Sequence, residues 1–270
     1  MKTVIVVQAR VGSSRLPSKV LLTLAGKTLL ERMIERVSAI KKDCDLVVAT
    51  TTSVEDERIR GLCKQIGIRC FSGSTTDLLD RHYQAGRELQ ADVIVKIPSD
   101  CPLIDPAVID RVFEFYFHGQ YDYVSNLHPA TYPDGNDVEI MSFGVLEEAR
   151  REATLPLELE HTTPFIWERP DRYRIGNVTW ETGLDYSMSH RWTIDYPEDY
   201  QFIKTIYDEL YTEQRPIFSL YDILELLKAK PGLFFINAKY AGVNWYRHHL
   251  SELKTITSAQ TRIIESAIYL

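Results

Sequence analysis

One stretch near the N-terminus points to the fold class: Val4-Ile5-Val6-Val7-Gln8-Ala9-Arg10-Val11-Gly12-Ser13-Ser14-Arg15-Leu16-Pro17-Ser18-Lys19. Its first part, Val4 to Val7, is a continuous β-branched run, which is typical of a strand buried on both faces of a parallel sheet. The runs Leu46 to Ala49 and Val93 to Ile97 have the same character. Helical patterns lie between them. This alternation predicts an α/β protein with a mainly parallel sheet.

The clearest helical pattern lies between the first two strands. Its apolar residues recur at helical spacing: Leu29, Leu30, Met33, Ile34, Val37 and Ile40. Four charged residues are assigned to the opposite face of this helix: Glu31, Arg32, Glu35 and Arg36. Thr28 followed by Glu31 predicts a capping box. Further helices are expected at 54–66, 75–89, 197–210 and 219–227. Further strands are expected at 69–71, 121–126, 137–142, 172–178 and 191–194.

The loop that follows the first strand is basic and contains a glycine. Arg10, Arg15 and Lys19 lie within ten residues, and Gly12 to Ser14 could turn backbone N–H groups toward one point. Such a loop at the carboxyl edge of a parallel sheet suits phosphate groups. Composition alone leaves two interpretations open, a triphosphate cradle and a solvated basic loop.

Two aspartates are expected at the same edge of the sheet. Asp100 follows the strand 93–97, and Asp195 ends the predicted strand 191–194. Because both follow strands, both should lie near the basic loop. A lone Asp100 could instead cap the next helix, although Asp105, immediately before Pro106, is better placed for that role.

Two other motifs resemble known sites but lack the right context. Ala25-Gly26-Lys27-Thr28 matches the end of a P-loop, yet the first glycine would fall at Leu21 and no strand precedes the segment. We therefore predict a turn at Gly26. Asp43-Cys44-Asp45 matches the D-x-D of nucleotide-sugar glycosyltransferases, but it precedes a strand, at the edge away from the chemistry.

Bulk composition narrows the function. The 270 residues carry a net charge of −7, which argues against a nucleic-acid partner. The four cysteines form no C-x-x-C pair, and we expect them to be reduced. No apolar run approaches the ~20 residues of a membrane span, and the N-terminal run is too short for a signal peptide. We therefore expect a cytoplasmic protein with no membrane partner.

The string Gln8-Ala9-Arg10-x-Gly12-Ser13-x-Arg15-Leu16-Pro17-x-Lys19 resembles the signature of the sugar cytidylyltransferases, which include the CMP-Kdo and CMP-sialic acid synthetases. The match is closer to the spore-coat polysaccharide biosynthesis cytidylyltransferase-like branch, although that branch usually has Gly where this chain has Ser18. The resemblance implies a nucleotide-diphospho-sugar transferase (GT-A-like) fold, a three-layer sandwich. It spans roughly residues 1–237, which we interpret as the nucleotidyltransferase domain. Residues 238–270 form a C-terminal tail of unknown role.

The resemblance also implies roles for individual residues. It implies that the nucleotide is bound by Gln8, Ala9, Arg10, Gly12, Ser13, Arg15, Lys19, Ser74, Asp77, Arg81 and Ser99. Ser74, Asp77 and Arg81 belong to an S-G-x-x-x-D-x-L-D-R segment, where a capped helix with an Asp77–Arg81 pair is the alternative. The catalytic residues would be Arg10, Arg15, Lys19 and Asp100. Asp100 and Asp195 would hold Mg²⁺, which prefers oxygen ligands.

On the acceptor side, the resemblance covers two more segments. Pro133-Asp134-Gly135-Asn136-Asp137-Val138-Glu139 places Asp137 and Glu139 on one strand face, where they would orient or deprotonate an acceptor hydroxyl. In the segment Glu160-His161-Thr162-Thr163-Pro164, His161 could bind the acceptor. Arg191 could contact an anionic acceptor. A solvent-exposed pair of carboxylates and a structural histidine are the alternatives.

The function implied is transfer of CMP from CTP to a sugar or acidic sugar, such as a nonulosonic acid, with release of pyrophosphate. The role would be surface polysaccharide or glycan biosynthesis. The partners would be CTP, a small-molecule acceptor and, as in relatives, a second subunit of a homodimer. Two alternatives stay open: a glycosyltransferase or uridylyl- or guanylyltransferase on the same fold, and a nucleotide-binding relative without turnover. No residue spacing here requires cytosine or names the acceptor.

Overall fold

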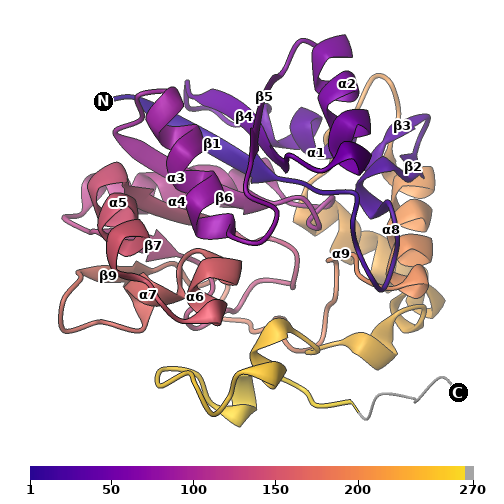
Figure 1. Ribbon diagram of the computed structural model, residues 1–270. Coiled ribbons are helices and arrows are strands. Elements are labelled where there is room, and N and C mark those ends of the chain that lie inside the picture. The colour runs from indigo at the N-terminus through magenta and orange to yellow at the C-terminus, as the bar shows by residue number, and fades with distance from the viewer. Residues whose placement is uncertain (265–270) are drawn as a thin grey trace, which may run out of the picture.

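A computed structural model describes residues 1–264. At its centre lies a seven-stranded sheet with the order β5-β4-β1-β6-β8-β7-β9 (Figure 1). The strands are β1 (Thr3–Gln8), β4 (Asp45–Thr51), β5 (Arg69–Gly73), β6 (Val93–Pro98), β7 (Tyr123–Ser125), β8 (Glu139–Ser142) and β9 (Ile175–Asn177). β1 pairs in parallel with β4 and β6, and β4 with β5. β8 is antiparallel to both β6 and β7, and β7 is parallel to β9. The sheet is therefore mainly parallel, as predicted.

Helices cover both faces of the sheet. Their bounds are α1 (Leu29–Val37), α2 (Glu57–Gln65), α3 (Leu78–Glu88), α4 (Pro106–His118), α5 (Phe143–Glu152), α6 (Pro156–His161), α7 (Pro164–Trp167), α8 (Pro197–Leu210) and α9 (Leu220–Ala229). Side chains of α1, α2, α4, α8 and α9 share one apolar core. Side chains of α3, α5, α6 and α7 share a second. These two cores make the three-layer sandwich that the sequence predicted.

The alternation of side chains along β1 supplies both cores. Ile5 and Val7 belong to the first core, whereas Val4 and Val6 belong to the second. Successive strand residues point to opposite faces, so a β-branched residue at every position suits a strand covered on both sides. The apolar run thus explains why the loop after β1 begins at the centre of the molecule.

Most predicted elements are present, with shifted ends. Helix α8 matches the predicted span 197–210, and Thr28 caps α1 in a capping box with Glu31. The helix expected from residue 54 begins with a 3₁₀ turn, Val54–Asp56. The strand expected at 191–194 is wrong. Its backbone bonds to separate loops, with the Trp192 amide donating to the Asp134 carbonyl (2.7 Å) and the Ile194 amide to the Asp100 carbonyl (2.9 Å), so no ladder forms.

A second correction concerns the polar face expected for α1. Arg32 and Arg36 are buried, with 2% and 1% of their surface exposed. The Arg36 guanidinium donates to the carbonyls of Ile104 (2.7 Å) and Phe218 (2.7 Å), and Arg32 Nε donates to the Leu24 carbonyl (3.0 Å). These acceptors come from other segments and allow the cations to be buried.

The P-loop-like segment at Gly26 and the D-x-D segment at Asp43 lie where the sequence predicted them. Ala25 and Gly26 form the turn of a small hairpin of β2 (Thr23–Leu24) and β3 (Lys27–Thr28), with φ of 45° and 82°. This geometry is not that of a phosphate-binding loop. Asp45 begins β4 and pairs with Lys2 (3.1 Å) and Arg69 (3.3 Å) at the amino edge of the sheet.

The C-terminal segment is built of short turns rather than long helices. It contains 3₁₀ turns at Ala238–Tyr240, Trp245–His248 and Ser258–Gln260. In Figure 1 it is the yellow chain that passes beneath the body of the molecule, below α6. Tyr246 and Leu253 join the second core, so the segment is packed on the main body. The boundary at residue 237 stays a prediction, and residues 265–270 of the expected tail lie outside the described residues.

Within the described residues, the four cysteines are free thiols. No helix of that part of the chain has the length and apolar character needed to cross a membrane.

Candidate active site

Lys19 lies between the two aspartates that the sequence placed at the carboxyl edge of the sheet. Its Nζ donates to Asp195 Oδ1 (2.9 Å), Asp100 Oδ2 (3.3 Å) and the Ile194 carbonyl (2.7 Å). Arg15 reaches the same Asp195 oxygen at 2.9 Å. The basic loop after β1 and the two carboxylates therefore meet at one point, although Lys19 and Asp100 lie 81 residues apart in the sequence.

Burial strengthens the charge interactions in this cluster. Burial raises the pKa of Asp195, but the charges of Lys19 and Arg15 outweigh that effect and lower it to about 2. Burial lowers the pKa of Lys19, but Asp100 and Asp195 outweigh this and leave it raised. Both groups are therefore charged at neutral pH. The cluster contains an ammonium and two carboxylates in a partly buried position.

A buried network behind Asp195 holds that residue in place. Asp199 is fully buried, and its carboxylate accepts from the amides of Asp195 (2.9 Å) and Tyr196 (3.0 Å). Asn237 Nδ2 donates to Asp199 (2.9 Å) and to the Arg191 carbonyl (2.8 Å). Asp199 therefore caps the chain before α8 from the interior of the molecule.

Arg191 is buried among the carboxylates of this network. Only 1% of its side chain is exposed. Its donors reach Asp199 (2.9 and 3.1 Å), Asp195 (3.4 Å), Asp134 (3.4 Å) and the Val243 carbonyl (2.8 Å). These contacts use all five N–H donors of the guanidinium. The acceptor role expected for Arg191 stays a prediction, and the contacts that the structure gives it lie against Asp195 and Asp199.

The loop after β1 is shaped by a residue that sequence analysis did not single out. Asp56 is buried, and its carboxylate accepts from the amides of Val11 (2.7 Å) and Thr51 (3.1 Å), and from the Thr51 hydroxyl. The Ser18 amide then closes the loop on the Val11 carbonyl (3.1 Å). Ser18 has φ 57°, a left-handed conformation that favours glycine. This explains why glycine suits that position in similar sequences.

The other residues of this loop that were expected to bind the nucleotide differ in exposure. Gln8 ends β1, and its carbonyl accepts from the Ser99 amide (3.2 Å), which joins the ends of β1 and β6. The buried Gln8 Oε1 has no hydrogen-bond partner among the described residues. Ala9 is buried after β1, whereas Arg10 and Gly12 are exposed and Ser13 is half-buried.

Arg81 is a buried cation next to this loop. It is 3% exposed, its Nε donates to the Ser74 carbonyl (2.9 Å), and none of the described carboxylates forms an ion pair with it. Burial and the nearby charge of Arg10 lower its pKa to about 10. Asp77 caps α3 through the Asp80 amide (2.7 Å) instead of pairing with Arg81. The capped helix suggested as an alternative is present, and its Asp77–Arg81 pair is not.

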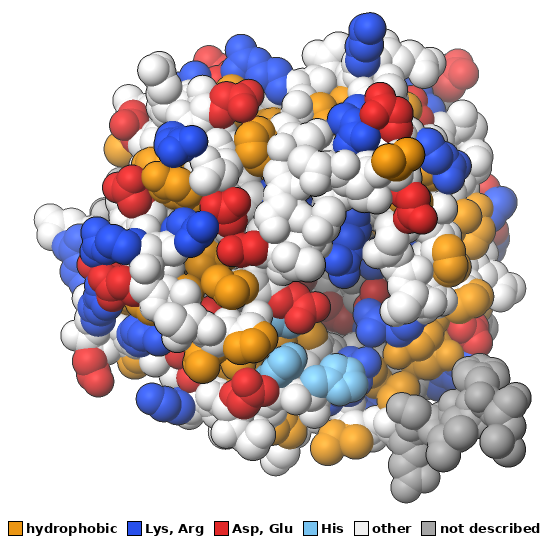
Figure 2. All heavy atoms as spheres, viewed as in Figure 1, with side chains coloured by type: hydrophobic (Ala, Val, Ile, Leu, Met, Phe, Trp, Pro, Cys, Tyr) orange, Lys and Arg blue, Asp and Glu red, His pale blue; other side chains and the backbone are white. Residues whose placement is uncertain are grey.

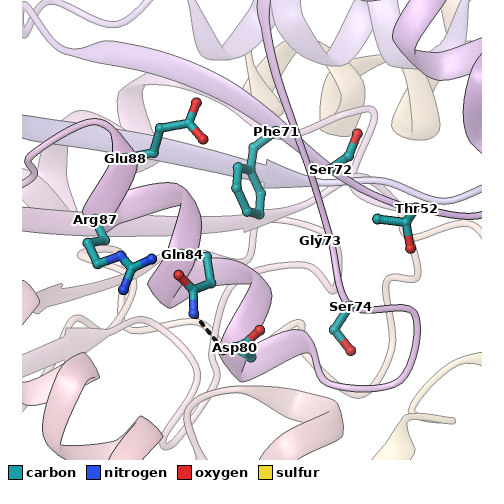
Figure 3. Close-up of a pocket in the computed structure, with 9 residues that line it drawn as sticks. All are labelled: Thr52, Phe71, Ser72, Gly73, Ser74, Asp80, Gln84, Arg87 and Glu88. Carbon is teal, nitrogen blue, oxygen red and sulfur yellow. Dashed lines mark hydrogen bonds between the residues drawn. The ribbon is translucent and has the colours of Figure 1, made fainter.

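A surface groove of about 660 Å³ lies between the end of β5 and α3. Figure 3 shows Phe71, Ser72 and Ser74 on one side of it, and Asp80, Gln84 and Arg87 along α3 on the other. Of the residues expected to bind the nucleotide, Ser74 lines this groove. Lys19, Asp100 and Asp195 do not, so the charged cluster and the groove are separate features.

The acceptor-side carboxylates have different surroundings. Glu139 is buried, pairs with Lys96 and accepts from the Tyr123 hydroxyl (2.6 Å). Burial raises the pKa of Glu139, but Lys96 outweighs that effect and lowers it. Asp137 is half-buried, and burial together with the charge of Asp100 raises its pKa to about 7. Glu139 is thus engaged within the protein, whereas the pKa of Asp137 responds to the charge of Asp100.

His161 is held between an aromatic ring and a strained turn. Its ring stacks on Trp245 with centroids 3.8 Å apart. The next residue, Thr162, has φ 75° and ψ −53°, and the Thr163 amide donates to the His161 carbonyl (2.9 Å). This is a classic γ-turn, which is strained for a β-branched residue. Such strain often marks a functional position.

Several supporting residues were missed by sequence reasoning: Asp56, Lys96, Asp134 and Asn237. Asp56 could have been found from the sequence, because it also follows a strand at the carboxyl edge of the sheet. The others carry no local signal, because their roles depend on contacts with distant segments. Among the described residues, no group of three or more His, Cys, Asp or Glu side chains could hold a metal ion. Any metal here would use the two aspartates together with oxygens of a substrate.

The parallel sheet, the loop after β1 and the two carboxylates define a nucleotidyltransferase. A family model described as cytidylyltransferase matches residues 4–223, and the chain belongs to that family. This finding confirms the resemblance inferred from the loop at Gln8.

Two further comparisons agree. The spore coat polysaccharide biosynthesis protein SpsF of Bacillus subtilis is 32% identical over 231 residues, 84% of this chain and 94% of that protein. A solved cytidylyltransferase from Leptospira borgpetersenii superposes with a TM-score of 0.81 at 32% identity, covering 87% of this chain and 97% of that one.

A more distant structure supports the fold. It is CMP:2-keto-3-deoxy-manno-octonic acid synthetase complexed with CTP, with a TM-score of 0.60 at 17% identity. The superposition covers 77% of this chain and 99% of that one. The predicted GT-A-like fold is confirmed.

Proposed function

We propose that this cytidylyltransferase uses Mg²⁺ to transfer CMP from CTP to a hydroxyl of an acidic sugar, releasing pyrophosphate, in surface polysaccharide or glycan biosynthesis. One observation carries the proposal: Asp100 and Asp195 meet at Lys19 Nζ, at 3.3 and 2.9 Å. Two carboxylates and a cation thus lie together at the end of the loop after β1, which supports a role in binding a metal and phosphates. The name of the relative SpsF supports the polysaccharide context.

The two aspartates fit Mg²⁺. They offer carboxylate oxygens, they converge on a single positive group, and few other protein ligands are needed because Mg²⁺ keeps waters and substrate oxygens. When bound there, the metal would supply charge stabilisation and alignment of the phosphates. Arg191 and Asp199 hold Asp195 in position for this role.

The cations of the loop would bind the triphosphate. Arg10 is exposed, and Arg15 has 44% of its side chain exposed, so both can reach a ligand. Arg81, buried without a carboxylate partner among the described residues, would add a third positive charge on the nucleotide side. The free acceptor atom Gln8 Oε1 and the Ser74 loop would contact the nucleoside.

In the reaction, the acceptor oxygen forms a bond to the α-phosphorus of CTP. The bond between the α-phosphorus and the oxygen shared with the β-phosphate breaks, and pyrophosphate leaves with that electron pair. Asp137 would take the proton of the acceptor hydroxyl, since it lies on the acceptor side near Asp100. Arg15 and Lys19 would neutralise charge that develops on the leaving pyrophosphate.

Pyrophosphate release tests the proposal. Each of CTP, UTP, GTP and ATP would be paired with a panel of acidic and neutral sugars, with Mg²⁺ and with chelator. We expect turnover with CTP and Mg²⁺ only. Turnover with UTP but not CTP would overturn the base assignment. Normal CTP binding without turnover in any combination would instead indicate a non-catalytic relative. The cytoplasmic location and the homodimer remain proposals of the same kind.

A further inference from the structure

The C-terminal segment from Asn237 to His249 bridges the two sides of the site. At one end, the Tyr240 ring stacks on Tyr196, next to Asp195, with centroids 3.8 Å apart. In the middle, the Val243 carbonyl accepts from Arg191 (2.8 Å). At the other end, Trp245 stacks on His161. The segment therefore runs from the metal-side carboxylate to the acceptor-side histidine. It lies beyond residue 223, where the family match ends.

The turn Trp245–His248 is fixed in this position. Asn244 Oδ1 accepts from the Tyr246 amide (3.1 Å), and Asn244 Nδ2 donates to the Gln260 carbonyl (2.9 Å). The Tyr246 hydroxyl lies 3.4 Å from His128 Nδ1, and the Tyr246 side chain is packed in the second core. Because both flanks are anchored, the side chain of Arg247 is presented from a defined backbone.

Arg247 is a half-buried cation without an ion-pair partner among the described residues. It donates to the Asn244 carbonyl, and no carboxylate of the described residues forms an ion pair with it. Burial lowers the pKa of Arg247; the charges of Tyr196 and Asp195 oppose that shift, and the charge of Arg15 adds to it. Figure 2 shows histidine side chains beside basic and acidic ones at the lower rim of a hollow in this face.

We propose that Arg247 binds an anionic group of the sugar acceptor, a carboxylate or a phosphate, and that residues 237–249 form the acceptor-side wall of the site. The inference rests on the proposed function and adds to it the residue and the chain segment that would recognise the acceptor. A guanidinium binds planar carboxylates and phosphates in a bidentate manner. Arg247 comes two residues after Trp245, whose ring stacks on His161, and from there its guanidinium would hold such a group beyond the reacting hydroxyl.

The test uses the full chain and measures binding separately from turnover. Calorimetry with CTP and a chelator, so that no Mg²⁺ supports turnover, would compare N-acetylneuraminate and 3-deoxy-manno-octulosonate, as carboxylates, with hexose 1-phosphates and neutral mannose. We expect one anionic class to bind, which distinguishes carboxylate from phosphate. Arg247→Gln should weaken that binding by about 10- to 100-fold, as for loss of a charge-assisted hydrogen bond, and leave CTP affinity within about twofold. Arg247→Lys should recover part of the loss.

Lys254→Gln is the matched control, because it removes a positive charge from an exposed position shortly after this segment. Its acceptor affinity should equal that of the unmodified protein. Unchanged anion affinity in Arg247→Gln, or no preference of the unmodified chain for any anionic sugar over mannose, would overturn this inference. Failure of the proposed function is a separate result, absence of pyrophosphate release, and it does not change the binding comparison.

Discussion

The network behind Asp195 can be tested by replacing Asp199 with asparagine. The Asp199 carboxylate accepts hydrogen bonds from the backbone amides of Asp195 and Tyr196, from Asn237 Nδ2, and from Arg191 Nε and Nη2, all at 2.9 to 3.1 Å. Asparagine keeps the shape, but one acceptor oxygen becomes an N–H₂ donor and the negative charge is lost. At least one amide is then left facing a donor.

The expected cost follows from burial. Breaking a buried ion pair by removing one partner costs about 3–5 kcal/mol. Arg191 still has Asp134 and Asp195 as partners, at 3.4 Å each, so the lower part of this range applies. We therefore expect Asp199→Asn to lose about 3 kcal/mol of unfolding free energy. With Asp199 neutral, Arg191 should also form a stronger ion pair with Asp195. This pair would pull Asp195 away from the metal and so reduce turnover.

Urea unfolding followed by circular dichroism measures the free energy. Asp208→Asn serves as the control, because Asp208 lies on the same helix α8 and pairs with Lys204 at the surface, where half of each side chain is exposed. An exposed pair contributes below about 1 kcal/mol. If Asp199→Asn lowers the free energy of unfolding no more than Asp208→Asn does, the buried network does not hold Asp195 in place.

Three further changes have expected outcomes. Asp100→Asn should reduce Mg²⁺-dependent turnover by at least about 100-fold while the urea midpoint stays nearly constant, and full activity would refute the metal assignment. Ser18→Gly should raise the unfolding free energy by about 0.5–1 kcal/mol, because glycine adopts φ 57° without strain; a loss of stability would contradict this. Burial lowers the pKa of His82 to about 3, from an ordinary value of 6.5. The unfolded chain therefore binds a proton below pH 6.5 that the folded chain does not, and His82 should remove up to about 1.4 kcal/mol of stability per pH unit as the pH falls from 6.5 toward 3. In His82→Gln the slope of unfolding free energy against pH should be smaller by one proton, and an identical slope would exclude this origin.

Much of the site could be predicted because it lies at strand ends. β1 and β6 are marked by apolar runs, and the residues just after such strands share one edge of a parallel sheet. Lys19 and Asp100 were found in this way. Asp195 was also found, although the strand expected before it does not exist. Its position comes from the Ile194 amide bonding to the Asp100 carbonyl, a contact between segments that lie far apart in sequence.

Side-chain burial could not be predicted with the same rules. Arg36 reads as part of a polar helix face, yet it is buried because the carbonyls of Ile104 and Phe218 are brought to it. The sequence suggests that Arg191 is available to an acceptor. In the structure its guanidinium instead donates to the carboxylates of Asp134, Asp195 and Asp199. A charged group is buried only where partners are supplied, and those partners are set by tertiary packing.

Sequence alone therefore determined the parallel sheet, the basic loop after its first strand and the family, since apolar periodicity and short motifs are local properties. Tertiary structure decided which charges are buried with partners. Lys19 lies between two carboxylates, Arg191 is held in a buried network, and Arg247 follows the Trp245 ring that stacks on His161. The reason is physical: the free energy of a charge depends on the groups around it, and in a folded chain those groups come from distant positions.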